Sequence, residues 1–456
     1  MRDYGTIQGY LETVMEQIRW KRARPVVARE LEGHLEDQKE ALIREGKSPE
    51  EAERLAVADM GDPVEVGAAL DAVHRPRPQW GLLGLTIVLA VSCTVLRLVL
   101  TADWRFDGES LPLALLALLI GTGAMVGLYL LDISRLARYA RWIYIGTVVL
   151  GIGCDSLSLM HISPRLSHFS YYLSLFLPVV YALWVYACRG RGWPGLLFAI
   201  AGGIPLAFVS VWWYPSVTTL EVLVCSGFGV MLCAAWGDWF GVLRGRGTAA
   251  VLGISVLLGW SVWTLGLRHT ARWSIILHPE QDPLGAGWFI LQVQSFLQDA
   301  PLLRSGIGSV GVNTGSRVRL HGGMYIEEVL GRDFLPSILA VHWGWLPLVM
   351  LTAATAALVL WLAVRALKQK NRAGRLVALS VALAIGLRAV FSMVLNLGIL
   401  VFGASYPFLG GNTFLVADMA LIGLALSVFR GASIAREEPE KPLRQRKRLR
   451  IRVEYQ

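Results

Sequence analysis

The sequence predicts an all-α polytopic membrane protein with about ten membrane-spanning helices and a small N-terminal helical domain. Hydrophobic residues make up 54% of the 456 residues and charged residues only 17%. The mean hydropathy of +0.51 lies above the usual range of soluble domains. Charged residues are dense in the first 80 positions and afterwards lie mainly at the edges of apolar runs. We therefore place a domain boundary near Pro76 to Trp80.

The N-terminal segment 10–75 reads as short amphipathic helices. Leu31 and Leu35 supply an apolar stripe between acidic and basic residues. Ser48 is followed by Pro49, Glu50 and Glu51, a pattern typical of a capped helix start. The predicted boundaries are 1–78 for this domain, 79–435 for the membrane domain and 436–456 for a basic tail.

Short stretches of this domain resemble the HAAS or permease-prefix family. They are RELEGHLED at 29–37, EGKSPEEA at 45–52 and MGDP at 60–63. The resemblance implies a cytoplasmic module that senses a signal or binds a partner. Taken alone, the same charges are those of a solvated helix surface.

The membrane domain offers ten apolar runs of the length needed to cross about 30 Å of hydrocarbon. They lie near 82–101, 111–131, 142–160, 170–188, 193–214, 218–240, 248–267, 334–364, 376–403 and 413–429. Cations gather in alternate connections and in the tail 444–452. The positive-inside rule then places both termini in the cytoplasm and the long loop 268–332 outside the cell membrane. A membrane-surface role explains the net charge of +9 without nucleic acid.

The long external loop and its borders hold the candidate functional residues. They are Arg268, Arg272, Asp282, Gln292, Arg317 and Arg319, with Asp333 at the start of the eighth run and Asn396 at the end of the ninth. A loop of this length between spans is usually functional. The histidines show no ligand partner at zinc-like spacing, so we expect no protein-bound zinc. Arg388, inside the ninth run, is costly in lipid and is expected to face the interior of the bundle.

Several of these motifs together resemble the SEDS family (FtsW/RodA/SpoVE). The chain has Arg272 separated by six residues from PEQDPLGAG at 279–287, an Asp-Phe pair at 333–334, NLG at 396–398 and PFLGGN at 407–412. The resemblance is strongest from about 268 to 430.

The resemblance implies a peptidoglycan glycosyltransferase that polymerises lipid II at the outer membrane face, in cell shape, division or sporulation. It implies that Asp333 is the general base. Arg268, Arg272, Arg317 and Arg319 would be phosphate clamps, a role that a divalent cation could share. Asp282, Gln292 and Asn396 would contact substrate, and a class B penicillin-binding protein would be the partner.

Two other functions stay open from the residues. Val341 and His342 stand where the family shows an acidic pair, which favours a non-catalytic homologue that acts as scaffold or envelope sensor. Intramembrane charges such as Arg388 and Asp155 are compatible with a lipid flippase or transporter. Taken singly, Asp333 fits a helix cap and Asp282 a turn equally well.

Overall fold

The computed structural model describes residues 6–21, 23–74, 79–101, 110–131, 133–159, 172–211, 217–266, 274, 278–284, 287–298, 300–303, 332–399 and 404–431. Throughout these residues the regular secondary structure is helical. The prediction of an all-α polytopic membrane protein is confirmed.

The N-terminal helices are α1 (Ile7–Gln17), α2 (Arg24–Arg44), α3 (Pro49–Asp59) and α4 (Pro63–His74). They pack around a small core that contains Tyr10, Val14 and the predicted Leu31 and Leu35. The Ser48 hydroxyl accepts a hydrogen bond from the backbone N–H of Glu51 at 3.3 Å, which confirms the predicted cap of α3.

The membrane helices follow the predicted apolar runs in order. They are α5 (Trp80–Thr101), α6 (Leu111–Leu130), α8 (Ala140–Leu159), α10 (Leu177–Ala187), α11 (Gly192–Ala201), α12 (Gly203–Val211), α13 (Val217–Trp236), α14 (Arg244–Gly266), α18 (Leu335–Trp343), α19 (Trp345–Leu367), α20 (Arg372–Asn396) and α21 (Asn412–Gly431), with the short α7 (Ile133–Arg138) between α6 and α8. Within the described ranges, seven spans are long and apolar enough to cross a membrane, and three shorter apolar helices occupy the other predicted positions.

The eighth predicted run, 334–364, consists of two helices rather than one. Gly344 separates α18 from α19 with a φ of 100°, a conformation that glycine adopts without steric cost. A Cβ at this position would lie 2.7 Å from the carbonyl oxygen of Pro301. The next residue, Trp345, donates its N–H to that same oxygen at 3.0 Å. The part of the 268–332 loop around Pro301 therefore lies against the break.

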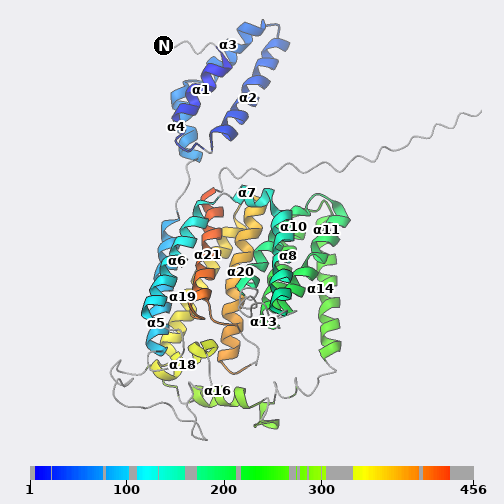
Figure 1. The fold of residues 1–456 in the computed structure, drawn as a ribbon. Helices are drawn as coiled ribbons and strands as arrows, with labels where there is room; N and C mark the ends of the chain where they lie inside the picture. The colour runs from blue at the N-terminus through cyan, green and yellow to red at the C-terminus, as the bar shows by residue number, and fades with distance from the viewer. Residues whose placement is uncertain are drawn as a thin grey trace, which may run out of the picture.

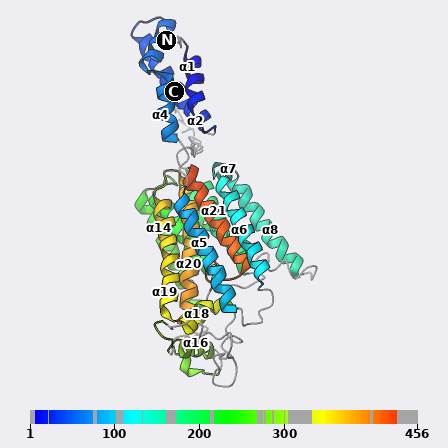
Figure 2. The same ribbon diagram turned by 90° about the vertical axis from the view of Figure 1, so that its left-hand side faces the viewer.

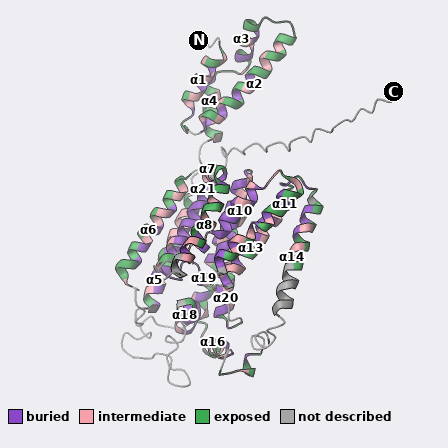
Figure 3. Ribbon diagram, turned by 45° about the vertical axis from the view of Figure 1, so that its right-hand side comes forward, coloured by how far each residue is buried: buried purple, intermediate pink, exposed green. Residues whose placement is uncertain are grey.

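Helix α20 occupies the middle of the bundle, packed against α10, α13, α19 and α21. Figure 3 shows buried residues concentrated on these central helices, whereas α6 and α14 on the periphery carry many exposed residues. Exposed leucines such as Leu115 and Leu119 on α6 are the surface expected of a helix that faces lipid.

The two ends of the bundle differ in composition. The N-terminal helices, α7 and the basic connections lie at one end (Figures 1 and 2), where α20 begins with Arg372 and Arg375. At the opposite end lie α18 and α16 (Trp288–Gln298), which belongs to the 268–332 loop. Helix α16 buries Ile290 and Val293, and the Gln294 amide donates to the carbonyl of Gly398 at 2.9 Å. The loop is thereby anchored to the end of α20.

Candidate site at the loop-bearing end of the bundle

Asp333 lies in a short 3-10 turn, η3 (Arg332–Phe334), directly before α18. Asp333 is an exposed residue, whereas Phe334 and residues 335–341 of α18 are buried. The Asp333 carboxylate accepts a hydrogen bond from the hydroxyl of Ser405, in the segment that joins α20 to α21. A carboxylate has room for about four hydrogen bonds, so the bond from Ser405 orients the group and leaves lone pairs that can accept further hydrogen bonds.

Asn396, the last residue of α20, fixes the backbone of this turn. Its side-chain amide donates to the carbonyl oxygen of Asp333 at 2.9 Å. Its amide oxygen accepts from the backbone N–H of Ser337 at 2.9 Å and from the Ser337 hydroxyl at 2.7 Å. Asn396 is 1% exposed. The structure thus gives Asn396 a bridging position behind Asp333, and its predicted contact with substrate stays a prediction.

The segment 404–411 approaches the turn from the other side. Arg388 of α20 and Asp418 of α21 form an ion pair inside the bundle, with side chains 5% and 0% exposed. The Asp418 carboxylate also accepts the backbone N–H of Phe408 at 2.9 Å. The Arg388 guanidinium donates to the carbonyl of Ser405 at 3.4 Å. The expectation that Arg388 faces the interior is confirmed.

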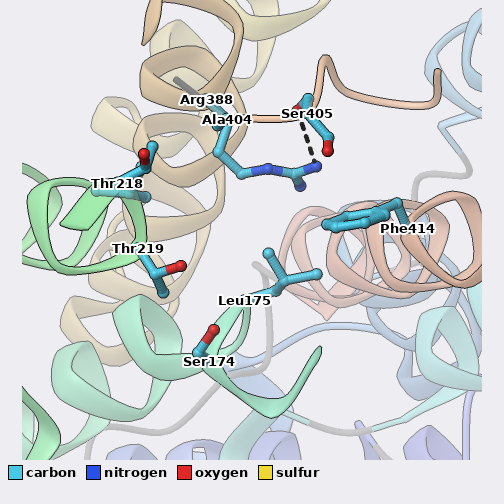
Figure 4. Close-up of a pocket in the computed structure, with 9 residues that line it drawn as sticks. Ser174, Leu175, Thr218, Thr219, Arg388, Ala404, Ser405 and Phe414 are labelled. Atoms are coloured by element: carbon cyan, nitrogen blue, oxygen red, sulfur yellow. Dashed lines mark hydrogen bonds between the residues drawn. The ribbon is translucent and has the colours of Figure 1, made fainter. Parts of the chain in front are cut away.

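A cleft opens beside this pair. Its lining comes from the residues just before α10, from α13 and α20, and from the 404–411 segment and α21. The lining residues are Ser174, Leu175, Thr218, Thr219, Val222, Arg388, Ala404, Ser405 and Phe414. Figure 4 shows the Arg388 side chain extended across the cleft toward Ser405, with the Phe414 ring next to its guanidinium. The guanidinium carbon lies 5.5 Å from the centre of that ring. Ser405 therefore joins the cleft to Asp333.

Asp282 lies in the 268–332 loop after a short 3-10 helix, η2 (Pro279–Gln281). Its carbonyl oxygen accepts the N–H of Gly287 at 3.1 Å, as in the turn that the sequence also allowed. In the same turn, hydrogen bonds from its own backbone N–H and from His278 hold the pKa of Glu280 below the ordinary value.

Other predicted site residues lie outside the described part of the chain: Arg268, Arg272, Arg317 and Arg319, together with the side chain of Gln292. Their predicted roles stay predictions. Among the described residues, no group of three or more histidine, cysteine, aspartate or glutamate side chains could hold a metal ion.

Sequence reasoning missed Asp418 and Ser405. Asp418 is an acid in an apolar run, the same signal that drew attention to Arg388, and pairing the two would have found the contact. Ser405 carried no comparable signal, because a serine near a helix end is common. Arg97 was also overlooked: it is buried in α5 and its guanidinium donates to the Asn412 side chain at 2.5 Å.

Comparison with known proteins reveals three curated relatives, each named as a probable peptidoglycan glycosyltransferase FtsW. The chain is 28% identical over 250 residues to the protein of Thioalkalivibrio sp. (strain K90mix), covering 49% of this chain and 59% of that protein. It is 27% identical to the Trichlorobacter lovleyi protein and 30% identical to the Geobacter sp. (strain M18) protein. Each match covers 45% of this chain, and respectively 50% and 53% of the relative. The chain thus spans about half the length of the relatives it matches. No protein-family model matches the sequence.

A solved structure shares the fold. It comes from work on the structural coordination of polymerization and crosslinking by a peptidoglycan synthase complex. The TM-score is 0.55 at 21% sequence identity, and the match covers 77% of this chain and 98% of the other. The likeness therefore concerns most of this chain and nearly all of the chain it matches.

Proposed function

We propose that this chain is a divergent SEDS-type peptidoglycan glycosyltransferase that polymerises lipid II at the outer face of the plasma membrane. Similarity to proteins named as glycosyltransferases supports the reaction class. The observation that carries the proposal is the exposed Asp333 carboxylate, which is oriented by Ser405 and backed by Asn396. Asp333 directly precedes α18, which lies at the end of the bundle opposite α7 and the N-terminal helices (Figure 1).

In the proposed reaction, Asp333 takes the proton of the acceptor sugar hydroxyl as that oxygen attacks the anomeric carbon of the donor. A new glycosidic bond forms, and the bond from the anomeric carbon to the polyprenyl pyrophosphate breaks. Negative charge then gathers on the leaving phosphates. Arg268, Arg272, Arg317 and Arg319 are proposed to bind those oxygens, because guanidinium groups match phosphate geometry. Asp282, Gln292 and Asn396 are proposed to bind the glycan portion.

The proposed orientation follows from charge. Cationic connections favour the cytoplasmic side, which would place both termini and helices α1 to α4 in the cytoplasm and Asp333 outside. The N-terminal helices are proposed to be a HAAS-like regulatory domain. A class B penicillin-binding protein is the proposed partner, since the solved structure with this fold belongs to a complex described as coordinating polymerization and crosslinking.

Asp333→Asn tests the proposal because it keeps the shape of the side chain and removes its ability to accept a proton. Purified protein is incubated with labelled lipid II, with and without the partner transpeptidase, and the glycan strands are resolved by electrophoresis. We expect strand formation to fall by about 100-fold or more, the scale of a lost general base. Glu280→Gln is the matched control, as an exposed acid in the external loop. Wild-type rates in Asp333→Asn would contradict the assignment.

A non-catalytic role as a scaffold is the second candidate. The positions where the SEDS family shows an acidic pair hold Val341, which is buried and apolar, and His342. Under this alternative the wild-type protein forms no strands alone or with its partner. It would still bind the transpeptidase, and Asp333→Asn would leave that binding unchanged.

A further inference from the structure

The ion pair between Arg388 and Asp418 lies at the start of a chain of contacts that ends on Asp333. Asp418 accepts the N–H of Phe408, a buried residue held at a φ of 63°. A side chain other than glycine is strained in that conformation, so the surrounding contacts must hold it there. The Asp418 carboxylate therefore fixes the shape of the 404–411 segment.

Arg388 acts on the same segment at a second point. One arm of its guanidinium binds Asp418, and the other donates to the Ser405 carbonyl at 3.4 Å. This bond is long, but its donor is charged and is enclosed by the Phe414 ring on one side (Figure 4). The Ser405 hydroxyl then donates to the Asp333 carboxylate. Four side chains from separate elements thus connect the interior of the bundle to its surface.

We propose that Arg388 and Asp418 are positioning residues for Asp333, which act through the 404–411 segment and the Ser405 hydroxyl. The consequence for turnover rests on the proposed glycosyltransferase function. The positioning itself is a statement about geometry and is testable without any enzymatic assay.

Fold stability alone does not account for this pair. Replacing both partners of a buried ion pair by apolar residues of similar volume is often neutral or stabilising, because charge burial is costly. The double variant Arg388→Met with Asp418→Leu should therefore retain the bundle. It removes the guanidinium that holds Ser405 and the carboxylate that holds Phe408.

The first measurement is a cross-link between positions 333 and 405. In a background with the native cysteines replaced, Asp333→Cys and Ser405→Cys are bridged by a short bis-methanethiosulfonate, which forms a disulfide with each thiol and releases methanesulfinate. The rate of bridging is followed by mass spectrometry. A second pair, Val359→Cys with Gly386→Cys, reports on the integrity of the α19–α20 contact. A Cβ on Gly386 would lie 3.9 Å from the Val359 Cβ, suitable for a disulfide.

We expect the apolar double variant to slow the 333–405 bridge by about tenfold or more, the scale of a lost charge-assisted hydrogen bond. The 359–386 disulfide should form as in the parent. An unchanged 333–405 rate overturns the proposal. Should both pairs fail because the double variant does not fold, Arg388→Lys replaces it. Lysine keeps the charge opposite Asp418 but lacks the second arm of the guanidinium, so an unchanged 333–405 rate in this variant also overturns the proposal.

The second measurement is polymerisation by the full-length protein that carries Asp333. Ser405→Ala and the apolar double variant should each lower kcat by about tenfold and change KM little, and combining them should add little, because coupled residues act as one unit. Additive losses would contradict action through Ser405. If the wild-type protein forms no strands, the proposed function fails, whereas the positioning inference is still decided by the cross-linking rates.

Discussion

Ion pairs occur in two very different settings in this molecule. In the N-terminal helices, Lys39 pairs with Glu53 and Lys47 with Glu51 at side-chain exposures between 24% and 53%. Inside the membrane bundle, Arg388 and Asp418 pair with almost no exposure. Water competes for the exposed charges, so each exposed pair contributes little to the free energy of unfolding. A buried charge that loses its partner has no water to solvate it and strongly destabilises the fold. Ion pairs therefore have little influence on the structure of the N-terminal helices, whereas the Arg388–Asp418 pair holds the 404–411 segment in place.

The largest effect should come from breaking the buried pair on one side only. Arg388→Leu leaves the Asp418 carboxylate uncompensated, and we expect a loss of about 3–5 kcal/mol in unfolding free energy. Denaturation of the detergent-solubilised protein by SDS titration measures it. Arg375→Leu, the same change at the basic end of α20, is the control and should cost less. Equal losses of unfolding free energy in the two variants would show that the buried pair is no more important for stability than an arginine at the end of the helix.

The second-largest loss of stability should come from removing the uncharged hydrogen bonds of Asn396. Asn396→Ala deletes the donor to the Asp333 carbonyl and leaves the buried Ser337 N–H without its acceptor. We expect a cost of about 1–3 kcal/mol in unfolding free energy, because unsatisfied buried groups are penalised. Ser380→Ala, a buried serine bonded within α20, is the control. A loss in Asn396→Ala no greater than in this control would contradict the bridging role.

The Glu53 pair should show its effect through pH. Hydrogen bonds from Lys39 and then from the Ile7 N–H lower the pKa of Glu53 below its ordinary 4.5. A carboxyl with a lowered pKa in the folded state stabilises that state above pH 4.5, and the contribution disappears as pH falls through the lowered value. Hydrogen exchange of α1 to α3 in the full chain, corrected for intrinsic rates, should show less protection in Glu53→Gln than in wild type at neutral pH.

The difference between wild type and Glu53→Gln should vanish in acid. Glu51→Gln, in a more exposed pair, is the control and should show a smaller difference at every pH. A difference for Glu53→Gln that stays constant with pH would show that the ion pair is not its cause.

The smallest effect should come from Lys47. It pairs with Glu51 one helical turn away at 3.2 Å, and both side chains are about half exposed. Lys47→Ala should change protection of α3 by no more than about 0.5 kcal/mol, and less at high salt. A loss larger than that in Glu53→Gln would reverse the order expected from exposure.

Hydropathy was enough to predict most of the fold, because lipid demands long apolar helices whatever their partners. The Ser48 cap and the inward-facing Arg388 also followed from local rules. Gly344 did not, because a glycine inside an apolar run is tolerated in many helices. Only its contact with Pro301, more than 40 residues away, makes it a break.

The candidate site was harder to predict for a related reason. Asp333 was predicted as a site residue from a resemblance, and its surroundings depend on residues brought together from the start of α18, the end of α20 and the 404–411 segment. Asn396 was expected to contact substrate on the strength of a motif, and its position behind Asp333 follows from tertiary packing that no local pattern contains. Asp418 lies 30 residues from Arg388, beyond the reach of helical periodicity.

The length of helix α20 has a consequence for the candidate site. The helix extends for 25 residues, a rod of about 37 Å, from Arg372 to Asn396. At one end, the guanidinium carbons of Arg372 and Arg375 each lie 5.8 Å from the centre of the Trp239 ring. Toward the other end, the helix carries Arg388, which contacts Ser405, and Asn396, which contacts Asp333. Because α20 is one continuous hydrogen-bonded helix, Arg388 and Asn396 are held at a set spacing from each other and from the basic end of the bundle.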